Sequence, residues 1–211
     1  MHIPDGFISA PVATTGIVVA AGCIAYAVKV TNEKMVEKQI PLMGVLAAFI
    51  FAAQMLNFPI AGGTSGHLIG ATLAAILLGP WAGILIMTCV LAVQCLVFQD
   101  GGLFALGVNI FNMGIVASFV GYYVYRGSAL FGGQKRRTLI GGGLAAWSSV
   151  VIASIACAFE LAISGTVPLR VALPAMAGVY AFIGIGEGMI TAAVLSLIMA
   201  TRADLLELQK A

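Results

Sequence analysis

The amino-acid sequence predicts an all-α integral membrane protein with seven transmembrane helices. Only 9% of its 211 residues are charged and 61% are hydrophobic, whereas soluble domains carry about 25% charged residues. The mean hydropathy is +1.09. Apolar windows of about twenty residues, the length that crosses a bilayer, recur along the chain and leave no room for a soluble domain. We therefore expect one transmembrane domain over residues 1–211, and the net charge of +2 is too small to suggest nucleic acid.

Proline, glycine and polar residues divide the chain into an N-terminal segment 1–9, a helical bundle 10–200 and a short tail 201–211. The first span, 11–30, follows Ser9 and has Pro11 in its first turn, which suits a helix start. No Lys or Arg occurs in residues 1–9, so this run is predicted to be a retained helix rather than a cleaved signal peptide. A third, short span from near Ser65 to Gly79 would need shelter by neighbouring helices. The other spans are 41–58, 81–98, 103–125, 139–163 and 174–200.

The positive charges predict the orientation of the bundle. With the N-terminus outside, Arg170 alone among the Lys and Arg residues lies on the external side. Cytoplasmic loops carry an excess of Lys and Arg, so we expect an external N-terminus and a cytoplasmic C-terminus. This places Met1, His2 and the segment before His67 on one external face. The predicted cytoplasmic cations are Lys29, Lys34, Lys38, Arg126, Lys135, Arg136, Arg137, Arg202 and Lys210.

Met1 and His2 form a compact chelator. The amine of Met1, the backbone nitrogen of His2 and the His2 imidazole can bind one metal ion in two fused rings. The amide nitrogen must lose its proton, which Ni²⁺ and Cu²⁺ favour, and these ions suit a planar nitrogen set, whereas Zn²⁺ prefers a tetrahedron. His67, the other histidine of the chain, is the candidate for the fourth corner. Since free amines and imidazoles titrate near 7.7–8.0 and about 6.5, we expect metal affinity to fall steeply below neutral pH.

Turn residues support this arrangement. The sequence Pro4-Asp5-Gly6 is typical of a turn that folds the N-terminus back into the bundle, with Asp5 bonding its own backbone rather than the metal. Thr64 or Ser65 can cap the third helix, which would place His67 in the first turn of that helix. The alternative for His67 is a structural histidine that is hydrogen-bonded to a loop carbonyl.

Two carboxylates fall inside apolar spans, where acids usually face the bundle interior. Glu160 lies toward the outer end of the sixth span and could support the metal ligands or form an acidic entry to them. For Glu187, in the middle of the seventh span, we expect a structural hydrogen bond to a neighbouring helix. The candidate partners of both acids are Gln54, Gln94, Asn109 and Asn112.

Small and soft residues in the spans serve packing. Cys23, Cys89, Cys95 and Cys157 all lie in apolar runs without CxxC spacing, so they are expected to be small buried hydrophobes. Ala48 and Ala52 have the small-xxx-small spacing that lets helices approach closely. Packing within the bundle is the simpler interpretation of this pair, and docking of a partner protein is the alternative.

Residues 1–7, the segment Gly66-His67-Leu68 and the seven apolar spans together resemble the membrane-embedded substrate-binding component of energy-coupling factor nickel/cobalt transporters. The resemblance covers essentially the whole chain. It implies that the amine of Met1, the amide and imidazole of His2, and His67 bind the metal. Pro4-Asp5 is more similar to the nickel branch, so Ni²⁺ is the expected substrate and Co²⁺ the alternative.

The same resemblance implies a multi-pass protein of the prokaryotic cell membrane that is not itself an enzyme. The implied partners are a transmembrane coupling protein, two ATP-binding cassette ATPases and often a small accessory membrane protein. The chain lacks the Walker pattern G-x-x-x-x-G-K-[ST], so ATP hydrolysis must come from those partners.

Two other classes compete with this interpretation. Gly63-Thr64-Ser65-Gly66 matches the G-x-S-G of rhomboid intramembrane proteases, with Ser65 as the nucleophile, but such an enzyme needs a histidine base on a later span. No histidine follows His67. A vitamin-binding component would need an aromatic-lined pocket and would leave Met1 and His2 without a role.

Overall fold

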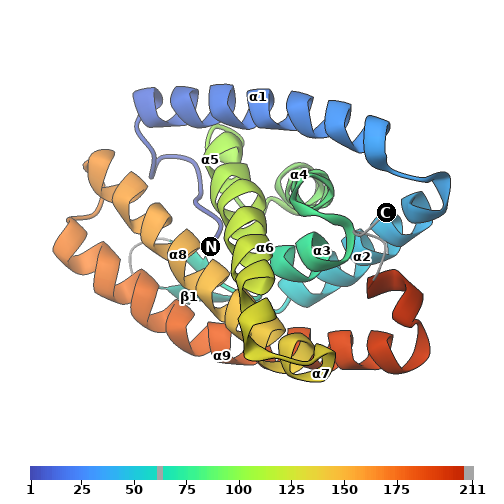
Figure 1. Ribbon diagram of the computed structural model, residues 1–211. Helices are drawn as coiled ribbons and strands as arrows, with labels where there is room; N and C mark the ends of the chain where they lie inside the picture. The colour runs from blue at the N-terminus through green and yellow to red at the C-terminus, as the bar shows by residue number, and fades with distance from the viewer. Residues whose placement is uncertain (61–63, 207–211) are drawn as a thin grey trace.

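The computed structural model describes residues 1–60 and 64–206, and it is a bundle of apolar helices (Figure 1). Within the described residues, five helical segments are long and apolar enough to cross a membrane: Ala10–Lys34, Pro80–Phe98, Leu106–Leu130, Gln134–Ile163 and Leu169–Thr201. The first two are α1 and α4, and the last is α9. The membrane character and most of the predicted spans are thereby confirmed.

The third and fourth of these segments are stacks of shorter elements. π-helical turns interrupt both, and such turns are frequent at functional sites. A short 3-10 helix, η1 (Glu37–Gln39), precedes α2. Another, η5 (Ala203–Leu206), follows α9. The stacked elements are α5 (Leu106–Ile110), η2 (Phe111–Val116), α6 (Ala117–Gly127) and η3 (Ser128–Phe131), then α7 (Gln134–Arg136), η4 (Arg137–Gly141) and α8 (Gly142–Ile163).

The second and third predicted spans are shorter than the others. Helix α2, Ile40–Gln54, has 15 residues, and α3, Ala71–Leu78, has 8. An eight-residue helix is about 12 Å long, against about 30 Å of hydrocarbon, so α3 does not cross a bilayer by itself. All its residues from Ala71 to Leu77 are buried, and α3 packs on α4, α6 and α8. The expected shelter is confirmed, but the expected start near Ser65 is wrong.

An antiparallel hairpin occupies the chain between α2 and α3, so the all-α prediction misses two short strands. Strand β1, Phe58–Ile60, pairs with β2, Thr64–Gly66, with Phe58 opposite Gly66. Residues 61–63 between them, including Gly63 of the G-x-S-G motif, lie outside the described residues. A Cβ on Gly66 would lie 2.7 Å from the Phe58 ring, so a larger residue here would have to displace that ring. The predicted helix caps Thr64 and Ser65 are therefore strand residues.

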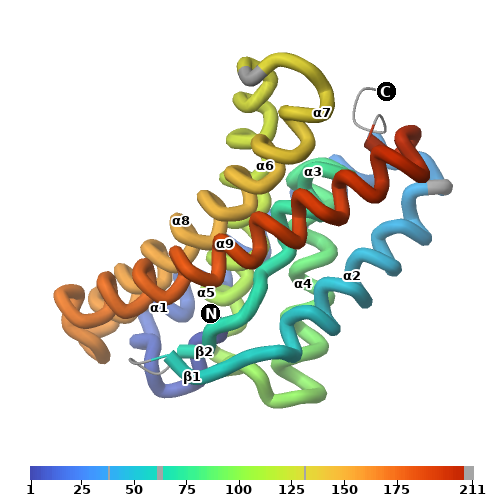
Figure 2. The backbone as a smooth tube through the Cα atoms, turned by 90° about the horizontal axis from the view of Figure 1, so that it is seen from below, coloured from blue at the N-terminus to red at the C-terminus, as the bar shows by residue number. Residues whose placement is uncertain are grey.

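Helix α9 begins at Leu169, earlier than the predicted start at Pro174, and its 33 residues include that proline. It packs along α8, where a Cβ on Gly188 would lie 2.8 Å from the carbonyl oxygen of Gly143. Helix α1 lies across α4 and α5 on the opposite side of the bundle (Figure 1). The N-terminal segment turns back under α1 and ends near the hairpin (Figure 2), with Met1 fully buried.

Candidate metal centre

Hydrogen bonds to the loop between α4 and α5 and to α5 itself hold the N-terminal segment inside the bundle. The backbone N–H of Ile3 donates to Asn109 Oδ1 at 2.9 Å, and Asn109 Nδ2 donates to the Ile3 carbonyl at 3.1 Å. The Gly102 N–H donates to the same carbonyl at 2.9 Å. Asn109 thus bonds the Ile3 backbone as a neighbouring strand would, and this fixes the register of Met1 and His2.

Asp5 fixes the same segment from outside. Its carboxylate accepts hydrogen bonds from the backbone N–H groups of Leu103 and Phe104, both at 2.9 Å, and of Ala105 at 3.3 Å. The predicted turn is present, with Gly6 at φ +88°, but Asp5 bonds the residues just before α5 rather than its own backbone. Asp5 is therefore an anchor that supports the site from a distance.

Gln94 of α4 determines the tautomer of His2. His2 Nε2 lies 3.0 Å from Gln94 Oε1, which can only accept, so Nε2 carries the proton and donates it. The lone pair then resides on Nδ1, the nitrogen that can close a chelate ring with the His2 amide. Outer-shell hydrogen bonds of this kind orient metal-binding histidines.

His67 is fixed in the complementary way. Its Nδ1 lies 2.6 Å from the carbonyl oxygen of Leu68 and donates to it, which leaves the lone pair on Nε2. The Met1 amine lies 2.6 Å from this Nε2, and the rings of His2 and His67 are stacked at 4.5 Å. Two nitrogens bound to one ion at right angles are about 2.8 Å apart for bonds of about 2.0 Å. The spacing of the amine and His67 fits such a pair. However, His67 lies in the extended segment before α3, so its predicted place in the first helical turn is wrong.

The Ser65 hydroxyl lies over this group of nitrogens. Its Oγ is 3.2 Å from the Met1 amine, 3.2 Å from the His2 amide nitrogen and 3.4 Å from His2 Nδ1. The Ser65 carbonyl accepts from the Met1 amine and, at 2.8 Å, from the hydroxyl of Tyr180 on α9. The neighbouring Thr64 points elsewhere, and its hydroxyl donates to the sulfur of Met176.

Burial keeps the candidate donors in their neutral, metal-binding forms. Desolvation lowers the pKa of the Met1 amine from 8.0 to about 4. Desolvation, together with the nearby amine, lowers the pKa of His2 to about 3 and holds that of His67 well below 6.5. Two imidazoles and one amine are therefore unprotonated at neutral pH, with their lone pairs free.

Asp100 adds a negative group at the edge of the site. One of its oxygens lies 3.4 Å from His2 Nδ1, and the other accepts from Asn57 Nδ2 at 2.9 Å. Burial raises the pKa of this carboxyl, and the Met1 amine partly opposes that shift. In the described part of the chain, no three His, Cys, Asp or Glu side chains gather as a metal cluster.

Other predicted residues lie apart from these nitrogens. Glu160 accepts a hydrogen bond from Asn112 of η2, and no contact described for Glu160 reaches Met1, His2 or His67. Ala48 and Ala52 lie on an exposed face of α2.

The buried amides Gln94 and Asn109 were predicted as partners of the two acids, but they hold His2 and Ile3 instead. The sequence pointed to neither this role nor that of Tyr180. Amide side chains inside apolar runs were the available signal, since a buried polar group needs a partner.

The protease alternative lacks the required geometry. A Ser-His-Asp triad has the serine and the acid on opposite nitrogens of the imidazole. Here Ser65 and Asp100 both approach Nδ1 of His2, and Gln94 occupies Nε2.

The chain is similar to known transport proteins over its full length. A family model described as the cobalt uptake substrate-specific transmembrane region (CbiM) matches residues 2–205. A protein of Archaeoglobus fulgidus, provisionally named fused nickel transport protein NikMN, is 45% identical over 214 residues, which cover 100% of this chain and 69% of that protein. A protein of Haloquadratum walsbyi, provisionally named a metal transport protein, is 42% identical over 97% of this chain and 93% of its own length.

A solved structure described as a truncated transition metal transporter superposes with a TM-score of 0.88 at 35% identity, and covers 95% of this chain and 99% of that one. None of these relatives is named as an enzyme. The match of the family model over nearly the whole sequence, together with these relatives, shows that the chain belongs to the CbiM family of cobalt uptake substrate-specific transmembrane regions.

Proposed function

We propose that this protein is the substrate-binding subunit of an energy-coupling factor transporter, and that it captures Ni²⁺ outside the cell for ATP-driven uptake. Met1, His2 and His67 are the metal-binding residues of this proposal. The observation that carries it is the convergence of four nitrogens, each with an available or ionisable donor position. They are the Met1 amine, the His2 amide, Nδ1 of His2 and Nε2 of His67.

Charge balance supports a divalent ion at this position. Ionisation of the His2 amide neutralises one of the two charges of the metal, and the carboxylate of Asp100, beside His2 Nδ1, offsets the other. A buried charge is tolerated only when it is paired, so a divalent ion with this donor set leaves no net charge at the metal site.

Nickel is favoured over cobalt because a planar set of four nitrogens suits Ni²⁺. The Archaeoglobus relative carries nickel in its name and the family description carries cobalt. Co²⁺ is therefore the alternative substrate. The supporting residues in this proposal are Ser65, next to the ligands, and Asp5, Thr64 and Glu160, which lie farther away.

The proposed topology has the N-terminus outside and the C-terminus in the cytoplasm of a prokaryotic cell. Helices α1, α6 and α9 have a basic residue at or next to their C-terminal ends, Lys34, Arg126 and Arg202, on the proposed cytoplasmic side. This placement follows the positive-inside rule. Lys210 lies outside the described residues. The proposed partners are a transmembrane coupling protein, two ATP-binding cassette ATPases and a small accessory membrane protein. The exposed pair Ala48 and Ala52 on α2 is the candidate docking face.

The test is metal analysis of the purified protein together with its optical and magnetic properties. A planar nickel–nitrogen site gives a yellow, diamagnetic species at one ion per chain. A paramagnetic Ni²⁺ complex, or tighter binding of Zn²⁺ than of Ni²⁺, would contradict the planar four-nitrogen site.

A further inference from the structure

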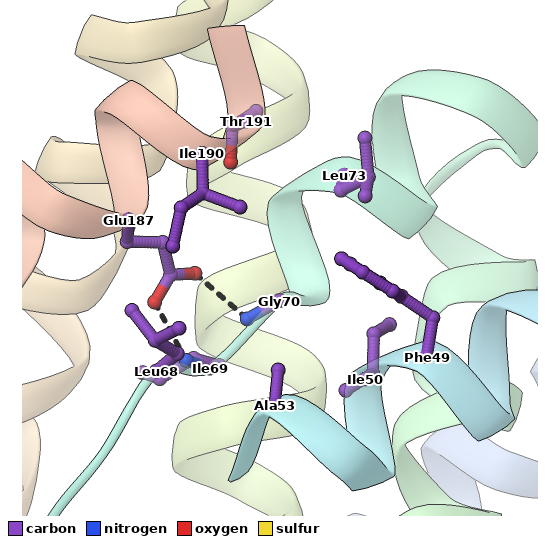
Figure 3. Close-up of a pocket in the computed structure, with 10 residues that line it drawn as sticks. All are labelled: Phe49, Ile50, Ala53, Leu68, Ile69, Gly70, Leu73, Glu187, Ile190 and Thr191. Carbon is purple, nitrogen blue, oxygen red and sulfur yellow. Dashed lines mark hydrogen bonds between the residues drawn. The ribbon is translucent and has the colours of Figure 1, made fainter. Parts of the chain in front are cut away.

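Glu187 of α9 forms two hydrogen bonds with the segment that carries His67. Its Oε2 accepts from the Ile69 N–H at 2.6 Å and its Oε1 accepts from the Gly70 N–H at 2.7 Å, as Figure 3 shows. Glu187 is buried in the middle of α9. The expected structural hydrogen bond of this acid is present, but its partners are backbone groups before α3 rather than a helix.

A second buried side chain holds the same segment from the other side. Gln54, the last residue of α2, donates from Nε2 to the Ile69 carbonyl at 2.6 Å. The next carbonyl toward the N-terminus, that of Leu68, accepts the Nδ1 proton of His67. The orientation of the His67 ring therefore depends on where the backbone of residues 68–70 is held.

The residues around Glu187 and Gly70 leave little room for the backbone of residues 68–70 to lie differently. Gly70 has φ +79°, and a Cβ there would lie 2.8 Å from the Ile50 side chain. A small cavity of about 20 Å³ beside the carboxyl group is lined mainly by apolar side chains of α2 and α9, including Phe49, Ala53 and Ile190 (Figure 3). A space of this size holds about one water molecule, so little solvent lies beside the Glu187 carboxylate and the two N–H groups that it bonds.

The two N–H groups belong to Gly70, the N-cap residue of α3, and to Ile69 before it. A side chain at the N-cap accepts from N–H groups two or three residues into the helix, so it would bond neither of these two. The acceptor comes instead from a residue 118 positions away, at the cost of burying a carboxyl group in an apolar bundle. The close contact between Gly188 and Gly143 fixes the depth at which α9 presents this group.

We infer that Glu187 is a positioning residue for metal binding: by holding the Ile69 and Gly70 amides it places His67 against the Met1 amine and links the metal site to α9. This inference rests on the proposed function. A displacement of α9 then changes the metal affinity through His67 without touching the metal.

The test compares Ni²⁺ binding by Glu187 variants of the purified full-length protein in lipid nanodiscs. Glu187→Gln loses one acceptor and places an amide N–H₂ against a backbone N–H, so we expect the Kd for Ni²⁺ to rise by about 10- to 100-fold, as for other supporting groups of metal sites. Glu187→Asp keeps both oxygens on a shorter side chain and should fall between that variant and the wild type. The matched control is Thr191→Val, one turn farther along α9 and lining the same cavity, which should keep the wild-type Kd.

Two readouts separate positioning from general stability. The thermal unfolding of each metal-free variant reports stability, and a merely structural Glu187 would lower it without changing the Kd. An unchanged Kd in a folded Glu187→Gln protein would overturn the inference while leaving the proposed function intact. Failure of the wild type to bind Ni²⁺ would overturn both.

Should the Glu187 variants fail to fold, hydrogen exchange of the wild-type protein decides the question. Positioning before metal arrives requires that the amides of residues 69 and 70 be protected in the metal-free protein. Slow exchange of a peptide covering residues 67–72 without Ni²⁺ supports the inference. Exchange at the rate of an unstructured chain until Ni²⁺ is added would refute it.

Discussion

The pH dependence of metal binding follows from the burial of the donors. If the Met1 amine and both imidazoles were solvated, with pKa values near 8 and 6.5, lowering the pH from 7 to 5 would weaken binding by about 10⁶- to 10⁷-fold, since four protons would compete. Burial lowers the pKa of the amine to about 4 and that of His2 to about 3. Only the His2 amide then exchanges a proton for the metal above pH 5. We expect a fall of about 100-fold over the same interval, one proton per pH unit.

The direction of these shifts also determines the stability of the metal-free protein. The unfolded chain binds protons at the amine below pH 8.0 and at His2 below pH 6.5, and the folded chain does not until about pH 4 and 3. Stability rises with pH wherever the unfolded state binds more protons. The contribution of these groups is therefore fully present above pH 8 and is lost as the pH falls toward 4. The thermal midpoint of the metal-free protein should rise between pH 5 and pH 8.

Isothermal titration with Ni²⁺ in buffers of different ionisation enthalpy counts the protons released. We expect about one proton per ion at pH 7, and the sequence alone predicted a steeper dependence because it treated the donors as solvated. Release of three or four protons would refute the burial argument. An affinity independent of pH would exclude amide ligation and favour a site with oxygen ligands that include Asp100, the carboxylate beside His2.

Five further perturbations test the ligands and their supports. His2→Ala and His67→Ala should each abolish tight Ni²⁺ binding in a folded protein, as measured by metal analysis after desalting, and retention of wild-type affinity would exclude that ligand. One residue added before Met1 converts the amine into an amide and should be equally damaging, whereas a C-terminal tag should leave the titration unchanged. Ser65→Ala should leave uptake largely intact in a cellular nickel assay. The Ser65 hydroxyl accepts from the His2 amide, and that amide loses its proton in the proposed complex. Detection of a cleaved membrane substrate that depends on Ser65 would revive the protease alternative. Gln94→Leu removes the acceptor that fixes the His2 tautomer and should weaken binding by about 10- to 100-fold, and an unaltered Kd would show that the tautomer is fixed in another way.

The sequence predicts most of the bundle because transmembrane helices have a strong signal. Length and hydropathy are enough for α1, α4 and α8, whose predicted and observed ranges largely coincide. The hairpin and the late start of α3 were missed because Thr64, Ser65 and Gly66 are as compatible with a helix cap as with a short strand. The predicted start of α9 at Pro174 was wrong for a related reason. Proline often begins a helix, but here α9 begins at Leu169 and continues through Pro174.

The candidate metal donors were predicted and their supports were not. Met1, His2 and His67 are rare residue types in a distinctive pattern, so the sequence singles them out. Asn109 and Glu187 act on backbone N–H and C=O groups, which every residue carries, so no pattern in the sequence identifies their partners. Those partners follow from the packing of helices that are far apart along the chain.

The N-terminal segment has partners that are remote in sequence, and this affects how the site is assembled during folding. The Met1 amine bonds Ser65, 64 residues away, Ile3 bonds Asn109, 106 residues away, and the Phe7 carbonyl bonds Thr166, 159 residues away. Closing such long loops costs entropy before any contact compensates for it, and non-local contacts form slowly. Helices therefore form first and docking of the first seven residues comes late. In refolding experiments, recovery of the helical signal should precede the ability to capture nickel, so capture of the metal reports completion of the fold.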